Sequence, residues 1–488
     1  MGPKLIEKNG KERKHIAMLL FAISLFAYLA ITAYVWDSPF IYDEGVYVLM
    51  TTEFSGNPLM VIPSATGEHP EWKPPLLSWI YFVFYFFLKW LPIPVEMAMR
   101  APTAIFGAAS VCLTFLVGEN LYNRRTGIYA AAILACTPLM VFCSVIAMME
   151  ALSIFLSLAA IYSYLKGKVR VGALLLGLLV LTKGLYVVVP VPFLVAYFWR
   201  KKEFGSVMLS FLAIPAAFGI YFLLAALFGD FGHAFDASLT YIIRSSAKPA
   251  TLATLKHVYW NMRLGLYVVF PLSTLFLIAV VARRRTVMQN LPVAAMASIA
   301  VVSPLFPHFI FWYMSLSLPG LALFLGRIID GVRTERNQVL WLLLLISATL
   351  MLGDKRFYST PYPTGAKEVA EFTKGKGVLF VEPGYFYQNW VDTNRDYLGT
   401  DAERLVLEQH NPGFLFYRFG ESKDYGNLKT KFIYGVKGTY APSCSGYLVL
   451  HERDRGSNYE YSVEIPEDYE FLWRKGDYAV WKGRADCR

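Results

Sequence analysis

The feature that most constrains this chain is a series of long apolar stretches that recur through its first 353 residues. A helix that crosses a bilayer needs about 20 consecutive, mostly apolar residues. Segments of roughly this kind fall at 16–36, 74–91, 99–118, 126–145, 147–165, 170–182, 184–199, 206–228, 259–282, 290–305, 309–328 and 338–352. The sequence therefore predicts an all-α polytopic membrane bundle of about 12–13 transmembrane helices.

Charge content supports this prediction. Charged residues make up 17% of the 488 residues, against about a quarter in soluble domains, which argues against a purely soluble enzyme. Residues 1–353 carry 27 Lys+Arg and 16 Asp+Glu, whereas residues 354–488 carry 19 and 20. The basic excess thus belongs to the apolar part, where it reports membrane orientation, and no nucleic-acid partner is expected.

Two domains follow from this division. Residues 1–353 are predicted to form the transmembrane domain, and residues 354–488 a soluble α/β domain. The second domain has a helical stretch near 364–374, and Gly, Pro, Asn and Asp turns separate its apolar runs. These runs lie at 377–381, 414–419, 431–436 and 446–451, and a hairpin at 469–482 closes the chain.

Clusters of Lys and Arg set the expected sidedness, because they favour the cytoplasmic side. This rule places the first loop, 37–73, the second large loop, 229–258, and the C-terminal domain outside the cytoplasm. Arg124 and Arg125 conflict with a count of crossings from residue 73, so either one segment between 74 and 145 is re-entrant or the segments are miscounted. Since the C-terminus carries no ER-type retention signal, we expect a multi-pass protein of a prokaryotic plasma membrane.

The first loop begins with two adjacent carboxylates, Asp43 and Glu44, which are costly to place at a membrane surface. If 43–54 is a short interfacial helix, Asp43 and Tyr47 share a face and Glu44 is turned away. An aspartate with a pKa near its ordinary value of about 3.9 is ionised at neutral pH and can act as general base toward a hydroxyl. The same two acids would also suit a helix N-terminus that needs negative charge.

The first loop ends with Lys73, Pro74 and Pro75. Proline suits the first turn of a helix and restricts the residue before it, so Lys73 is predicted at the mouth of the second span, with its ammonium at headgroup depth. That position suits a phosphate whose lipid tail lies in the bilayer. It also suits a lysine that merely extends its ammonium to the interface.

Further ionisable groups recur at the same predicted depth. Glu150 follows two methionines at the start of a span, and Lys183 interrupts an otherwise apolar run. Charges within a membrane are functional candidates, and these two can pair, either in a site or as a purely structural ion pair. His308 and Tyr313 lie at the start of another span.

With these motifs in view, residues 16–330 resemble the GT-C superfamily of membrane glycosyltransferases, in the branch of the protein O-mannosyltransferases and the lipid A aminoarabinose transferase. The resemblance depends on the order and spacing of several short motifs. These are Asp43-Glu44, Lys73-Pro-Pro-Leu, Arg100-Ala-Pro-Thr-Ala-Ile-Phe-Gly, Asn123-Arg124-Arg125, Glu150, Thr182-Lys183-Gly184, and Tyr313 before Leu318-Pro319-Gly320. Glu150 stands where the family usually has an aspartate, and the arginine commonly found shortly before that acid is absent.

The resemblance implies a fold, a reaction and a set of site residues. The donor would be a sugar, a hexose such as mannose or a pentose, on a dolichyl or undecaprenyl phosphate. A hydroxyl of a protein, a lipid-linked glycan or a glycolipid would displace the phosphate with inversion. Asp43 would be the catalytic base. The substrate-binding residues would be Glu44, Tyr47, Lys73, Glu150, Lys183, Arg244, His308 and Tyr313.

No cofactor or metal is expected, because the phosphate leaving group is stabilised by cationic side chains. Glu68, His69 and Glu71 are too few for a four-coordinate zinc site. Cys444 and Cys487 form either a disulfide or two unpaired thiols. The main alternative function is a polytopic transporter, since buried charges also mark transport pathways; the long acid-bearing loop and the large soluble domain favour the enzyme.

Overall fold

The computed structural model describes most of the apolar part of the chain and one sheet of the C-terminal part. The described residues are 3–34, 74–88, 90–188, 190–228, 269–282, 284–302 and 311–352, the strands at 378–382, 431–434, 447–451, 469–475 and 478–483, and the single positions 44, 47, 51, 231, 232, 235 and 372.

The chain forms two compact units. The first comprises residues 1–35, 59–62 and 72–360, and the second comprises residues 36–58, 63–71 and 361–488. The predicted boundary between residues 353 and 354 lies outside the described residues and stays a prediction.

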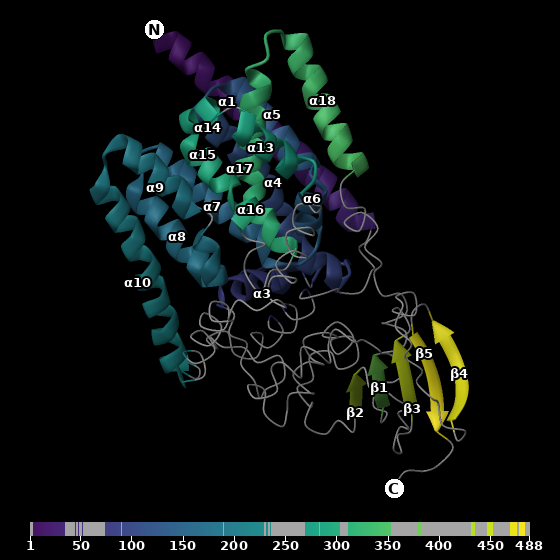
Figure 1. The fold of residues 1–488 in the computed structure, drawn as a ribbon. Coiled ribbons are helices and arrows are strands. Elements are labelled where there is room, and N and C mark those ends of the chain that lie inside the picture. Colours follow the sequence, from purple (N-terminus) through teal and green to yellow (C-terminus); the bar gives the residue numbers. More distant parts are fainter. Residues whose placement is uncertain are drawn as a thin grey trace, which may run out of the picture. The chain divides into compact units, whose positions relative to one another are not determined.

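The first unit is a helical bundle (Figure 1). Its described elements are α1 (Pro3–Tyr34), α3 (Leu76–Leu88), α4 (Val95–Leu121), α5 (Arg124–Cys136), α6 (Pro138–Val145), α7 (Met149–Leu165), α8 (Val169–Lys183), the 3₁₀ helix η1 (Gly184–Val188), α9 (Pro190–Lys201), α10 (Phe204–Phe228), α13 (Leu272–Ala282), α14 (Arg284–Gln289), α15 (Leu291–Ala297), α16 (Ile299–Val302), the 3₁₀ helix η3 (Phe311–Ser317), α17 (Leu318–Asp330) and α18 (Glu335–Leu352).

Three of these helices are long and apolar enough to cross a bilayer: α1, α4 and α10. A fourth crossing arises if α5 and α6 count as one broken span. Their axes differ by 66°, because Pro138 lacks an N–H group and holds Thr137 in an extended conformation. The predicted helical membrane bundle is therefore confirmed, whereas the predicted total of 12–13 spans includes segments beyond the described residues and stays a prediction.

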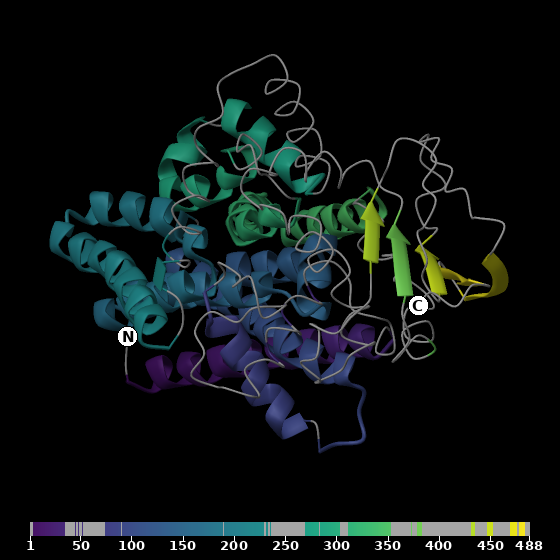
Figure 2. The same cartoon turned by 90° about the horizontal axis from the view of Figure 1, so that it is seen from below.

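Helix α4 is the packing centre of the described bundle, since α1, α5 and α7 all pack against it. Figure 2 shows α1 (purple) and α17 (green) on opposite sides of the α4–α7 helices (blue). Close approach of α4 and α5 depends on two glycines. A Cβ atom on Gly118 would lie 2.8 Å from the Cα atom of Gly127, and small residues of this kind allow helices to pack closely in a membrane.

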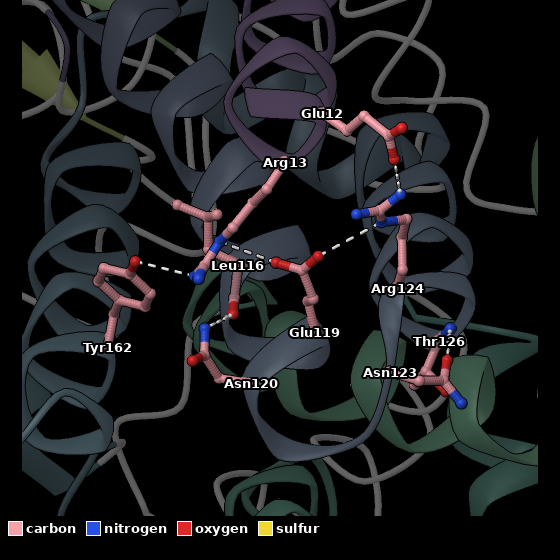
Figure 3. Close-up of polar contacts among 9 residues, drawn as sticks. All are labelled: Glu12, Arg13, Leu116, Glu119, Asn120, Asn123, Arg124, Thr126 and Tyr162. Carbon is pink, nitrogen blue, oxygen red and sulfur yellow. Dashed lines mark hydrogen bonds and ion pairs between the residues drawn. The ribbon is translucent and has the colours of Figure 1, made fainter. Parts of the chain in front are cut away.

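One end of the bundle, here called the basic end, is held together by ion pairs (Figure 3). Arg13 of α1 lies 2.8 Å from Glu119 of α4, and Arg124 of α5 lies 2.8 Å from Glu12. Arg13 also donates to the Tyr162 hydroxyl of α7 at 3.0 Å. The start of α1, the end of α4, the start of α5 and the end of α7 therefore share one end.

This arrangement resolves the conflict over Arg124 and Arg125. Helix α1 starts at the basic end, and α4 ends there, so α4 must begin at the other end of the bundle. The segment at 74–91, which comes just before α4, therefore does not cross the bilayer. Helix α3 has 13 residues, about 20 Å of helix, too short for a hydrocarbon core of about 30 Å. The Tyr81 hydroxyl of α3 donates to the Met148 carbonyl just before α7, at the opposite end, and Figure 1 shows α3 lying across that end. The segment predicted at 74–91 is thus not a full span.

The second unit contains a five-stranded mixed sheet. Its strands are β1 (Val378–Glu382), β2 (Lys431–Tyr434), β3 (Tyr447–His451), β4 (Tyr469–Lys475) and β5 (Tyr478–Gly483), in the order β2-β1-β3-β5-β4. β1 pairs in parallel with β2 and β3, while β5 is antiparallel to β3 and β4. These strands match four predicted apolar regions, including the closing hairpin; the run at 414–419 lies outside the described residues.

We predict that Gly127→Val lowers the unfolding free energy by about 1–3 kcal/mol or more, because its side chain would press on the α4 backbone. A Cβ atom at Gly127 already comes within 2.6 Å of the Phe115 carbonyl oxygen. Gly219→Ala in α10 is the control, since nothing lies within 4 Å of its Cβ position. Thermal unfolding in detergent measures both, and equal stability of Gly127→Val and wild type would contradict this packing.

We also predict that single cysteines at Arg125 and Leu91 react from opposite sides of the membrane. Both side chains are exposed, and they lie at the two ends of α4. Labelling with a membrane-impermeant thiol reagent, before and after permeabilisation, measures the side. Lys168→Cys is the reference for the basic end; labelling of Leu91→Cys from that same side would show that α3 crosses after all.

Candidate active site

Three side chains form a buried polar cluster at the end of the bundle opposite the basic end. The ammonium of Lys183 donates to the Tyr186 hydroxyl at 2.8 Å, and that hydroxyl donates to Glu150 Oε1 at 2.6 Å. The direct distance from Lys183 Nζ to Glu150 Oε1 is longer, at 3.5 Å. The predicted pairing of Glu150 with Lys183 is therefore present, with a tyrosine hydroxyl bridging the two charges.

The local backbone places each member of the cluster. Glu150 is the second residue of α7, where the positive end of the helix dipole favours a carboxylate. Lys183 is the last residue of α8, where the dipole favours a cation. The chain then tightens into η1. Residues i and i+3 of a 3₁₀ turn eclipse each other, which brings Tyr186 back over Lys183, its ring centroid 4.4 Å from the ammonium.

The cluster is deeply buried. Glu150 is 0% exposed, Tyr186 3% and Lys183 6%. Within the described part of the chain, the second carboxylate oxygen of Glu150, Oε2, has no hydrogen-bond partner. A buried carboxylate oxygen without a hydrogen bond costs free energy. A further hydrogen-bond donor placed at this oxygen would therefore be favourable.

Elements from several parts of the chain converge around the cluster. Tyr81 of α3 bonds the carbonyl of Met148, two residues before Glu150. The Cys143 thiol of α6 lies next to Ser315 of η3 and close to the charges of Glu150 and Lys183. The cluster therefore lies where α3, α6, α7, α8 and η3 meet.

Tyr186, Cys143 and Ser315 were not predicted as site residues. Tyr186 lies in an apolar run, Gly184-Leu185-Tyr186-Val187-Val188, that carries no sign of a change from α to 3₁₀ helix. Its position three residues after Lys183 is the one signal that could have singled it out. Cys143 and Ser315 are distant in sequence and were indistinguishable from core residues.

The ion pairs of the basic end differ from the buried cluster, because their side chains are partly exposed to solvent. Arg124 and Glu12 are 34% and 47% exposed. Lys166 follows α7 and donates to Asn120 Oδ1 at 2.6 Å; partial burial and the nearby Arg13 lower its pKa, and Glu119 opposes this effect. These contacts join helices to one another, so we regard the basic end as a structural frame.

The first-loop residues that can be described fit the predicted short helix at 43–54. Glu44, Tyr47 and Thr51 are each helical and buried, and the Thr51 hydroxyl donates to the Tyr47 carbonyl at 2.7 Å, one turn earlier. The other predicted residues lie outside the described part of the chain or have no described side chain: Asp43, Lys73, Arg244, His308, Tyr313, Cys444 and Cys487.

The sequence predicted no metal site. Among the described residues, no group of three or more His, Cys, Asp or Glu side chains could hold a metal ion. Glu68, His69 and Glu71 lie outside that part of the chain. The roles assigned to all these residues therefore stay predictions.

Comparison with solved structures identifies the fold. The chain matches the crystal structure of apo ArnT from Cupriavidus metallidurans with a TM-score of 0.54 and 12% identity, over 96% of this chain and 98% of ArnT. It matches ArnT bound to undecaprenyl phosphate with a TM-score of 0.52 and 15% identity, over 84% of this chain and 76% of that one. The chain has the GT-C fold. No family model matches the sequence, and no curated protein matches it; the GT-C likeness is one of structure.

In this GT-C bundle, we predict that Lys183→Met lowers the unfolding free energy by about 3–5 kcal/mol, because it leaves the Glu150 carboxylate buried without a cation. Adding Glu150→Gln to Lys183→Met should recover at least half of the loss, since the carboxylate that lost its partner is then replaced by a neutral amide. Lys168→Met, at an exposed position, is the control. Thermal unfolding in detergent measures all three, and additive losses in the double variant would contradict a coupled pair.

Proposed function

We propose that this protein is an inverting glycosyltransferase that moves a sugar from a polyprenyl phosphate to a hydroxyl group. The observation that carries the proposal is the buried Glu150–Tyr186–Lys183 cluster in a GT-C bundle. One solved structure with this fold, ArnT, is described as bound to undecaprenyl phosphate. An amphipathic lipid phosphate suits a cation at one end of a membrane bundle.

The donor phosphate is the group that needs positive charge. Lys183 would contact it from within the bundle, and Lys73 and Arg244 would add two more cations from the loops. As the bond between the anomeric carbon and the phosphate oxygen breaks, negative charge grows on the leaving phosphate. Fixed cations stabilise that charge most in a site with little water.

The acceptor hydroxyl needs a base. Asp43 would take its proton while the hydroxyl oxygen attacks the anomeric carbon from the side opposite the phosphate, so the configuration inverts. The products are the glycosylated acceptor and a polyprenyl phosphate, and the proton ends on Asp43. Such general-base assistance contributes about 10²–10⁴ in rate. Glu44, Tyr47, His308 and Tyr313 would line the sugar or the acceptor.

The sugar would be a hexose or a pentose, and the acceptor a protein, a lipid-linked glycan or a glycolipid. The carrier would be dolichyl or undecaprenyl phosphate. The reaction would take place on the extracytoplasmic face of the plasma membrane, the side opposite the basic end of the bundle. Incubating the purified protein with radiolabelled polyprenyl-phosphate sugars and each class of acceptor tests these choices directly.

We predict that Asp43→Asn lowers the transfer rate by about 10²–10⁴, because an amide cannot accept the proton. Binding of undecaprenyl phosphate should be unchanged, since the cations remain. Glu335→Gln, at an exposed position of the basic end, serves as the control and should keep full activity. Transfer at the wild-type rate by Asp43→Asn would remove Asp43 as the base, and solute uptake by proteoliposomes without any sugar transfer would favour a transporter.

A further inference from the structure

The hydroxyl of Tyr186 stands between a buried cation and a buried anion. It accepts a hydrogen bond from Lys183 Nζ at 2.8 Å and donates one to Glu150 Oε1 at 2.6 Å. Charged hydrogen bonds of nitrogen to a carboxylate are usually about 2.7–2.9 Å long. The direct separation of Lys183 and Glu150 is 3.5 Å, so the shorter contacts are those made through the tyrosine.

Two features hold Tyr186 in this place. The Lys183 ammonium lies 4.4 Å from the centroid of the Tyr186 ring, close enough for a cation–π interaction. Between them, Gly184 packs against Phe218 of α10, and a Cβ atom there would come within 2.7 Å of the Phe218 ring. The 3₁₀ turn after Lys183 is therefore fixed by a neighbouring helix.

The interposed hydroxyl changes what the lysine can do. In a medium of low dielectric constant, a contact pair of opposite charges is hard to separate, so a carboxylate in direct contact would hold the ammonium and neutralise it. A neutral hydroxyl still gives the ammonium an acceptor and fixes its position. It also occupies Glu150 Oε1, which keeps that oxygen from closing on the lysine.

We propose that Tyr186 is a positioning residue that holds the Lys183 ammonium in place for an anionic phosphate, by keeping Glu150 from closing into direct hydrogen-bond contact with it. The inference rests on the proposed function, because it assigns the Lys183 ammonium to the phosphate of the polyprenyl donor. Tyr186 itself contacts no reacting atom in this assignment. It acts through Lys183.

The test is binding of undecaprenyl phosphate, measured by native mass spectrometry in detergent. Tyr186→Phe keeps the ring and removes the hydroxyl, so Lys183 should close on Glu150. We expect the affinity for undecaprenyl phosphate to fall about tenfold or more. In the transfer assay, KM for the polyprenyl-phosphate sugar should rise by a similar factor while kcat changes less.

A second variant separates positioning from a structural role. In Tyr186→Phe with Glu150→Gln, the Glu150 carboxylate is no longer there to capture Lys183, so affinity for undecaprenyl phosphate should return toward the wild-type value. A merely structural tyrosine predicts the reverse, a double variant at least as impaired as Tyr186→Phe. Tyr221→Phe is the matched control, because Tyr221 is also buried and, among the described residues, its hydroxyl has no hydrogen-bond partner.

The outcomes distinguish this inference from the proposed function. A wild-type protein that neither binds undecaprenyl phosphate nor transfers sugar overturns both. A wild-type protein that does both, with Tyr186→Phe unchanged or the double variant unrescued, overturns only the role of Tyr186. If Tyr186→Phe fails to fold, Glu150→Gln is measured below its own unfolding temperature: its amide oxygen still accepts from Tyr186, and we expect tighter binding of undecaprenyl phosphate, whereas weaker binding by the folded variant overturns the inference.

Discussion

Charge is costly within a bilayer, and the arrangement of this bundle follows from how its ionisable side chains find partners. The described pairs fall at the two ends of the long helices. At the basic end, Arg13, Glu119 and Arg124 link α1, α4 and α5. At the opposite end, Lys183 and Glu150 link α8 to α7. Close packing of small residues adds to the ion pairs beside the basic end, where α4 and α5 meet at Gly118 and Gly127.

The same kind of ion pair has different consequences at the two ends. Exposed pairs such as Arg124 with Glu12 contribute about 0–1 kcal/mol each, yet several together fix which helix ends lie side by side. A buried pair such as Lys183 with Glu150 is weak evidence for stability, because desolvation offsets its attraction. A bundle that needed only stability would place apolar side chains there. The proposed function gives this buried pair a chemical role.

The basic residues predicted the direction of the chain better than the apolar residues did. Arg124 and Arg125 indicated the correct end of the bundle, in conflict with the count of apolar segments. The segment that caused the conflict is the apolar run at 74–91, which contains only a 13-residue helix, is followed by Pro92 and Pro94 and packs across the end of the bundle. Apolar residues are found both in protein cores and in contact with lipid, so they do not show whether a segment crosses the bilayer. Clustered Lys and Arg residues have a strong preference for one side of the membrane.

The sequence by itself determined the helical membrane bundle, the paired strands of the C-terminal part, and the identity of Glu150 and Lys183 as opposite charges at one depth. It could not determine that a tyrosine hydroxyl would bridge them. That contact depends on a 3₁₀ turn at Gly184, and the turn is packed against Phe218 of α10, 34 residues further along the chain. Local sequence sets which groups exist and how deep they lie, but only contacts between distant helices decide which of them touch.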